Sequence, residues 1–173
     1  PEFWKQFREW KGFQVLVSMM KRPNCSNSIR MLSLDFFGTA SKNPENLDAI
    51  IQAKFLEEVA QVQKQAKNKD VKAACLSILD RVTFEIQKHK KTAKKVSGQT
   101  GTCEEMLSVV LNQQATLKEK VSAIRIIVEL TGDDKMKDWW ISQIPGRTQE
   151  LFGLLQAWEK NDVLSNKDIM HLL

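Results

Sequence analysis

Glycine and proline are scarce in this sequence, with 7 glycines and 4 prolines among 173 residues. An all-β fold needs many tight turns, and these two residue types supply a large share of them. The charged fraction of 27% is ordinary for a soluble domain, and 42% of the residues are hydrophobic. A chain of this length can bury roughly two-thirds of its extended surface. We therefore expect one folded, all-α domain spanning residues 1–173.

Long apolar segments are also missing. No run approaches the roughly 18 consecutive apolar residues that a bilayer-spanning helix requires. The sequence does not open with a charged segment followed by a short apolar stretch and small residues, as a secretory signal does. We expect a soluble protein of the cytoplasm, the nucleus or both, without membrane insertion. Residues 1–3 are interpreted as a cloning remnant, and the apolar ending at residues 169–173 predicts a fragment of a longer protein.

The residues that carry catalysis or bind metal are few. Cys25, Cys75 and Cys103 are odd in number and far apart, a spacing that favours neither a disulfide framework nor a zinc site. The two histidines, His89 and His171, have no evident partner for acid–base or nucleophilic chemistry. The Gly-Asp-Asp at residues 132–134 is interpreted as a helix stop followed by a cap. We predict no enzymatic activity, no cofactor, no metal and no small-molecule substrate.

Apolar residues recur at three- and four-residue spacing in successive segments, which predicts a series of helices. Ser28, Asp70 and Thr102 are the expected N-caps of three of them, and Asn43 followed by Pro44 is expected to begin another. Residues 64–69 and 97–102 are expected to be loops. Helices are thus expected to end near residues 22, 38, 62, 95, 115 and 130, with shorter ones around residues 139–144, 151–158 and 168–173.

Three segments have a similar pattern of apolar and polar residues: "NSIRMLSLDFFGTAS" at 27–41, "DVKAACLSILDRVTF" at 70–84 and "LKEKVSAIRIIVELTGD" at 117–133. Each follows an amphipathic segment and a polar hinge. Their starts lie about 42 to 49 residues apart, a period typical of armadillo and HEAT repeats. A weak internal repeat is therefore predicted.

The sharpest match is "GFQVLVSMMKRPNCSNSIRMLSLDFFGTAS" at residues 12–41. It resembles the armadillo phrase in which one helix ends in a short polar hinge and the next repeat begins. The resemblance covers about residues 12–160 and implies a right-handed α-solenoid of about three armadillo-like repeats. Its inner helices would lie near residues 13–22, 45–65, 102–115 and 147–160. A HEAT-like solenoid and an irregular helical bundle are the alternatives.

The sequence departs from armadillo proteins that bind extended peptides. Those proteins hold the peptide backbone with an asparagine on the inner helix of each repeat. At the corresponding places this chain has Phe37 or Gly38, then Arg81, then Glu129. Capture of an extended basic peptide is therefore not expected, and the net charge of +5 also argues against it.

The stretch "KHKKTAKK" at residues 88–95 is the densest run of charge in the sequence. It is interpreted either as a solvated helix end or as a functional patch: a site for an acidic peptide, a site for a phosphate backbone, or an import signal. Trp139 and Trp140 are adjacent on an expected helix and cannot both point into one core, so one is a candidate interface anchor. The predicted partner-binding residues on the concave face are Arg81, Lys88, Lys91, Lys95, Trp139 and Trp140.

These features predict a non-catalytic scaffold or adaptor domain that binds a protein partner with an acidic surface or acidic flanks. The alternative is a compact helical module of a nuclear protein that binds chromatin proteins, transcription factors or nucleic acid through its basic patch. Nucleic acid is not favoured, because no aromatic residue is interleaved with the lysines for base stacking.

Overall fold

The computed structural model describes residues 2–89, 100–130, 138 and 142. All regular structure in these residues is helical, and they contain no strand, which confirms the all-α prediction. Within the same residues, none of the helices has the length and apolar character needed to cross a membrane. The helices are α1 (Glu2–Glu9), α2 (Gly12–Met20), α3 (Asn27–Ala40), α4 (Pro44–Gln52), α5 (Phe55–Gln65), α6 (Lys69–Lys88), α8 (Thr100–Leu111) and α9 (Leu117–Leu130).

Short polar side chains begin several of the helices, although three of the expected caps, Ser28, Asp70 and Thr102, are wrong. Ser26 caps α3 instead of Ser28, and its hydroxyl accepts a hydrogen bond from the Ile29 amide at 3.3 Å. Asn68 caps α6 in place of Asp70, because its carboxamide oxygen accepts the amide hydrogens of the second and third helical residues at 2.8 and 3.1 Å. The expected start of α4, with Asn43 as the cap and Pro44 first in the helix, is confirmed.

The helix expected over residues 45–65 is two helices, α4 and α5. Lys54 separates them because its backbone is left-handed, with φ of 55°, and an α-helix cannot continue through that conformation. Lys11 has the same conformation between α1 and α2, with φ of 53°. The two lysines stand 43 positions apart, at 11 and 54. In each case a fully buried phenylalanine, Phe13 or Phe55, follows within two residues.

Other expected boundaries also shift. Helix α2 ends at Met20 and α8 ends at Leu111, slightly earlier than the expected 22 and 115. Helix α8 already begins at Thr100, so the loop expected at residues 97–102 is wrong in its second half. Thr102 is not a cap, because it is fully buried within α8. Helix α6 ends at Lys88, earlier than the expected 95, and the expected helix at 147–160 lies outside the described residues.

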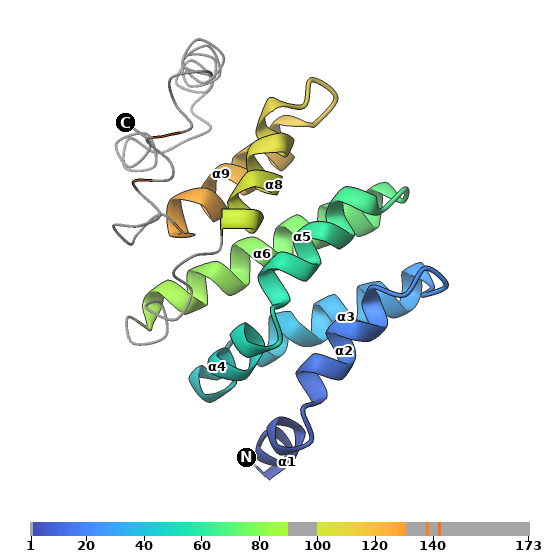
Figure 1. Cartoon of the computed structure of the whole chain (residues 1–173), viewed down its shortest axis with the longest axis vertical. Helices are drawn as coiled ribbons and strands as arrows, with labels where there is room; N and C mark the ends of the chain where they lie inside the picture. Colours follow the sequence, from blue (N-terminus) through green and yellow to red (C-terminus); the bar gives the residue numbers. More distant parts are fainter. Residues whose placement is uncertain (1, 90–99, 131–137, 139–141, 143–173) are drawn as a thin grey trace.

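The longer helices pack in pairs that succeed one another along the molecule. Helix α5 contacts α6, and α8 contacts α9, as α2 contacts α3. Figure 1 shows these three pairs side by side along the long axis. Helix α6 contacts α3 on one side and α9 on the other, while α5 contacts both α2 and α8. Two rows of helices result, α2–α5–α8 and α3–α6–α9, and α6 is in the middle of the second row.

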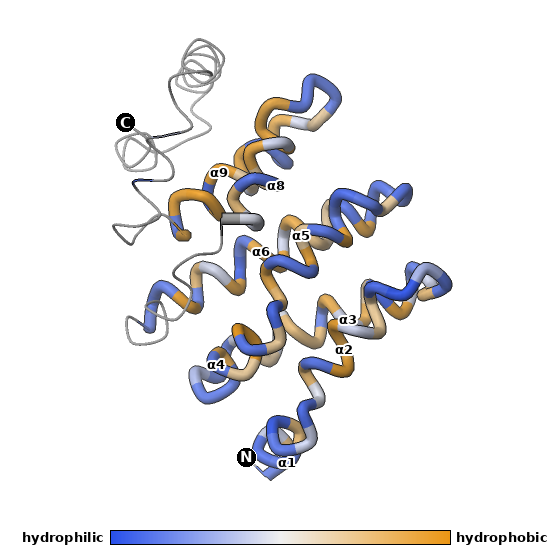
Figure 2. The backbone as a smooth tube through the Cα atoms, in the orientation of Figure 1, coloured by the Kyte–Doolittle hydropathy of each residue, from blue (hydrophilic) through white to orange (hydrophobic). Residues whose placement is uncertain are grey.

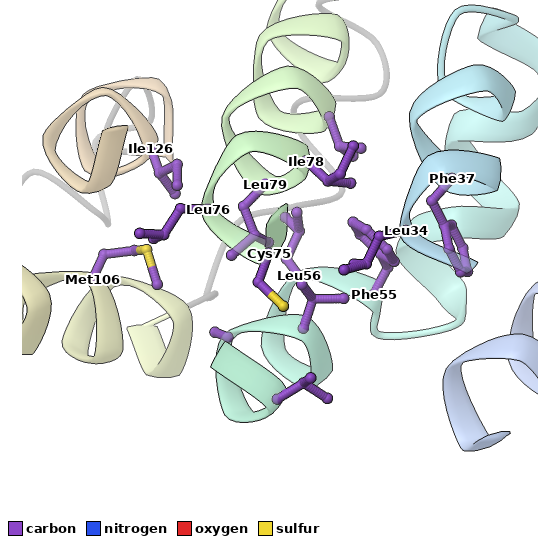
Figure 3. Packing of buried hydrophobic residues seen from close by; sticks show 14 of the residues in the cluster. Leu34, Phe37, Phe55, Leu56, Cys75, Leu76, Ile78, Leu79, Met106 and Ile126 are labelled. Atoms are coloured by element: carbon purple, nitrogen blue, oxygen red, sulfur yellow. The ribbon is translucent and has the colours of Figure 1, made fainter. Parts of the chain in front are cut away.

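The core is continuous across the pairs. Figure 2 shows apolar and polar residues alternating along the helices, as expected when each helix buries one stripe. In Figure 3, Cys75 and Leu79 of α6 point toward Leu56 of α5, and the rings of Phe37 and Phe55 lie beyond them with centroids 4.3 Å apart. On the other side of α6, Leu76 meets Met106 of α8 and Ile126 of α9 (Figure 3). Helix α6 therefore shares a core with both of its neighbouring pairs.

Ion pairs recur between successive helices of the α2–α5–α8 row. Lys21, just after α2, lies 2.7 Å from the carboxylate of Glu58 on α5. Lys64, near the end of α5, lies 2.7 Å from Glu105 on α8. In both pairs a lysine at the end of one helix reaches an acidic residue on the next helix of the row. The two lysines are again 43 positions apart, at 21 and 64.

Candidate interaction surface

The outer side of α6 carries one continuous exposed line of side chains. Its buried residues Val71, Cys75, Ile78, Val82 and Ile86 follow the three- and four-residue spacing of a helix face. The exposed residues have the same spacing on the opposite side, so they form a stripe along the whole helix. We call these residues the α6 stripe: Asp70, Ala73, Ser77, Arg81, Phe84 and Lys88.

Arg81 lies against α3 because that helix has a glycine at the contact. A Cβ atom on Gly38 would come within 3.0 Å of Arg81 Nη1 and within 2.9 Å of Ile78 Cδ1. Gly38 is buried, so the space that its missing side chain leaves is filled by residues of α6. Arg81 as a whole is exposed, and its guanidinium lies where α3 and α6 approach each other. A guanidinium group pairs well with carboxylates, because it can donate two parallel hydrogen bonds to one of them.

Phe84 is half exposed, at 51%, and Lys88 covers part of its ring. The Lys88 ammonium lies 5.1 Å from the ring centroid and 3.1 Å from the carboxylate of Glu85. The ring is therefore held by a cation–π contact on a side chain that is itself tethered by an ion pair. An aromatic ring ordered in this way and open to solvent is the type of residue that dominates protein interfaces.

The structure brings two of the predicted partner-binding residues together. Arg81 and Lys88 both belong to the α6 stripe. Lys91, Lys95, Trp139 and Trp140 lie outside the described residues.

Phe84 is not among the residues that the sequence predicted to bind a partner. Its position gave the signal, since residue 84 falls midway between the buried positions Val82 and Ile86 and so faces the other way.

The buried thiols are not suited to nucleophilic chemistry. Burial raises the pKa of Cys75 and of Cys103 from 9.0 to about 12. Each therefore stays a neutral thiol near pH 7, and a thiol is a much weaker nucleophile than a thiolate. In the part of the chain that the structure describes, no group of three His, Cys, Asp or Glu side chains is placed to hold a metal ion.

No protein-family model, curated protein or solved structure matches this chain.

Proposed function

We propose that this chain is a non-catalytic scaffold or adaptor domain that binds a partner protein, and that its helices form an α-solenoid of about three armadillo-like units. The observation that carries the binding proposal is the α6 stripe, where the guanidinium of Arg81 and the half-exposed ring of Phe84 are held side by side on one rigid helix. A charged group and an aromatic anchor on a preformed surface are what a docked protein recognises.

Three repeated features support the solenoid part of the proposal. Helix pairs succeed one another in two rows, with α6 between α3 and α9. Lysines with left-handed backbone conformation recur at positions 11 and 54, immediately before α2 and α5, which are neighbours in one row. Ion pairs recur between consecutive helices of one row, from Lys21 and from Lys64. A stack of similar units produces such a recurrence, because each unit repeats the same contacts with the next one.

The proposal is tested by affinity capture from native cell extract, with bound proteins identified by mass spectrometry and their affinities then measured with purified components. Arg81→Glu and Phe84→Ala should each weaken a partner that docks on the stripe by about tenfold. Lys42→Glu makes the same charge change at an exposed position outside α6, and Val15→Ala removes apolar surface that is 61% exposed on α2. These two controls should retain the partner.

Circular dichroism of all four variants should match the parent protein, because each substituted side chain is exposed. A partner that all four variants bind as tightly as the parent protein does would show that the α6 stripe is not the interface.

A further inference from the structure

A groove of about 1030 Å³ lies between the N-terminal halves of α6 and α9. The loops that follow α5 and α8 close one end of it, and Val109 of α8 contributes to its wall. Leu76, Val109 and Val121 are apolar and almost fully buried, so they form its floor. Leu117, which also lines the groove, is 43% exposed. Apolar surface is therefore accessible in a concave place, where a side chain from another protein can be buried.

Positive charge surrounds this floor. Among the residues that the structure describes, three acidic residues line the groove, Asp70, Asp80 and Glu119, and so do five basic residues, Lys67, Lys69, Lys72, Lys118 and Arg125. Glu119 is already used inside the protein, because its carboxylate accepts hydrogen bonds from the Thr116 amide and hydroxyl, both at 2.7 Å. None of the five basic side chains forms an ion pair with any residue that the structure describes. The groove therefore carries an excess of uncompensated positive charge.

The neighbouring groove differs in this respect. It has a volume of about 580 Å³ and lies between the ends of α2 and α5. Its arginine, Arg30, donates hydrogen bonds to the backbone carbonyls of Met20 and Arg22, both at 3.1 Å. That cation closes the C-terminal end of α2 and so serves the fold. The basic residues of the α6–α9 groove have no such structural role.

We propose that the α6–α9 groove binds an amphipathic helical segment of a partner protein whose apolar side chains are flanked by aspartate and glutamate. The apolar floor would receive the apolar side chains, and the basic rim would pair with the acidic flanks. This inference rests on the proposed interaction function and adds a contact site of defined chemistry that adjoins the α6 stripe, with which it shares Asp70, Ala73 and Ser77. Nucleic acid fits less well, because the three acidic residues would repel phosphates and none of the described residues that line the groove is aromatic, so none can stack on bases.

The test uses the full 173-residue chain and a displayed library of helical peptides. Apolar residues are fixed at positions i, i+3, i+4 and i+7 of each peptide, and the other positions are random. Selected peptides should be enriched in aspartate and glutamate beside the apolar face. The variant with Lys72→Glu and Arg125→Glu should bind them about tenfold more weakly than the parent chain. A control variant with Lys5→Glu and Lys42→Glu makes the same total charge change at exposed positions outside the groove and should lose no more than about twofold.

Selection of neutral or basic peptides would overturn the proposal, and so would equal weakening in the two double variants. A single-stranded DNA oligonucleotide is measured in parallel. If it binds, and only the groove variant weakens it, the groove is a nucleic-acid site and the proposal is also wrong. The scaffold function is tested by a different experiment, the binding of the native partner by the Arg81 and Phe84 variants. Neither residue lines the groove, so the two proposals can fail independently.

Discussion

Lys11 and Lys54 adopt a backbone conformation that disfavours their own side chains. In the left-handed region the Cβ atom crowds the following carbonyl oxygen, at a cost of roughly 1–2 kcal/mol for a residue other than glycine. Both lysines are exposed, so no burial of their side chains compensates. The conformation is imposed by the packing of the helices on either side, with buried Phe13 and Phe55 just beyond each lysine.

Replacing Lys54 by glycine should therefore stabilise the protein. We expect Lys54→Gly to raise the free energy of unfolding by about 0.5–1 kcal/mol, because relief of the steric conflict exceeds the extra entropy of the unfolded chain. Lys54→Val should lower it by more than about 1 kcal/mol, since a β-branched residue tolerates positive φ poorly. Urea denaturation of the two variants measures both changes.

Ser77→Gly is the matched control for this experiment, because Ser77 is exposed in the middle of α6 with ordinary helical geometry. Glycine should destabilise the protein there by about 0.5 kcal/mol. Destabilisation by Lys54→Gly of the same size would show that the left-handed conformation carries no strain.

The cysteines should differ in reactivity. Cys75 and Cys103 are fully buried with pKa values raised to about 12, whereas Cys25 is partly accessible. Iodoacetamide at pH 8, below the ordinary thiol pKa of 9.0, should modify Cys25 in the folded protein and the other two only after unfolding. Peptide mass spectrometry identifies the modified residue. Rapid modification of Cys75 in a protein that remains folded would contradict the packing described for α6.

The same two thiols should make stability depend on pH in alkaline solution. Each has a folded-state pKa raised by burial above the value of 9.0 expected in the unfolded chain. The unfolded chain therefore loses these protons first, and the folded state loses stability as the pH rises from about 9 toward 12. Replacing both cysteines by alanine should reduce this alkaline loss, as measured by urea denaturation at a series of pH values.

Individual helices depend on polar groups that occupy their first turn. Asn68 satisfies two amide groups of α6 with a single oxygen atom. We expect Asn68→Ala to lower the free energy of unfolding by about 1 kcal/mol, while Asn68→Asp should preserve it because aspartate accepts the same hydrogen bonds. Asn27→Ala, at the exposed first residue of α3, should change it by less than about 0.5 kcal/mol. Equal losses at Asn68 and Asn27 would show that capping is not responsible.

The sequence predicted the existence of most helices better than their limits. The spacing of apolar residues located α2, α3, α6 and α9. Each of these helices buries one face, and the residues of a buried face recur every three or four positions in the sequence. The break between α4 and α5 was not predictable, since a lysine at positive φ has no sequence signature and the apolar spacing continues past Lys54. The N-cap was predicted wrongly where two polar residues that can cap a helix lie close together in the sequence. At α6 the cap is Asn68, although Asp70 was expected.

At the scale of the molecule, the candidate surface could be predicted only where it belongs to one helix. Arg81 and Lys88 are seven positions apart, so helical periodicity alone placed them on one side of α6. The α6–α9 groove depends on how two helices, separated by α8, pack against each other. Periodicity describes one helix at a time and does not indicate that Lys72 of α6 and Arg125 of α9 line the same groove.

The position of α6 between two helix pairs also bears on how the protein opens. Helix α6 packs against α3, α4, α5 and α9, and eight of its residues are buried, whereas α1 has no buried residue. Because a segment opens more readily when few buried contacts hold it, amide hydrogens of α1 should exchange with deuterium early and those of α6 last. Mass spectrometry of peptides after timed exchange would resolve this order. The N-terminal helix α1 can therefore open while α6, which carries the candidate surface, stays folded.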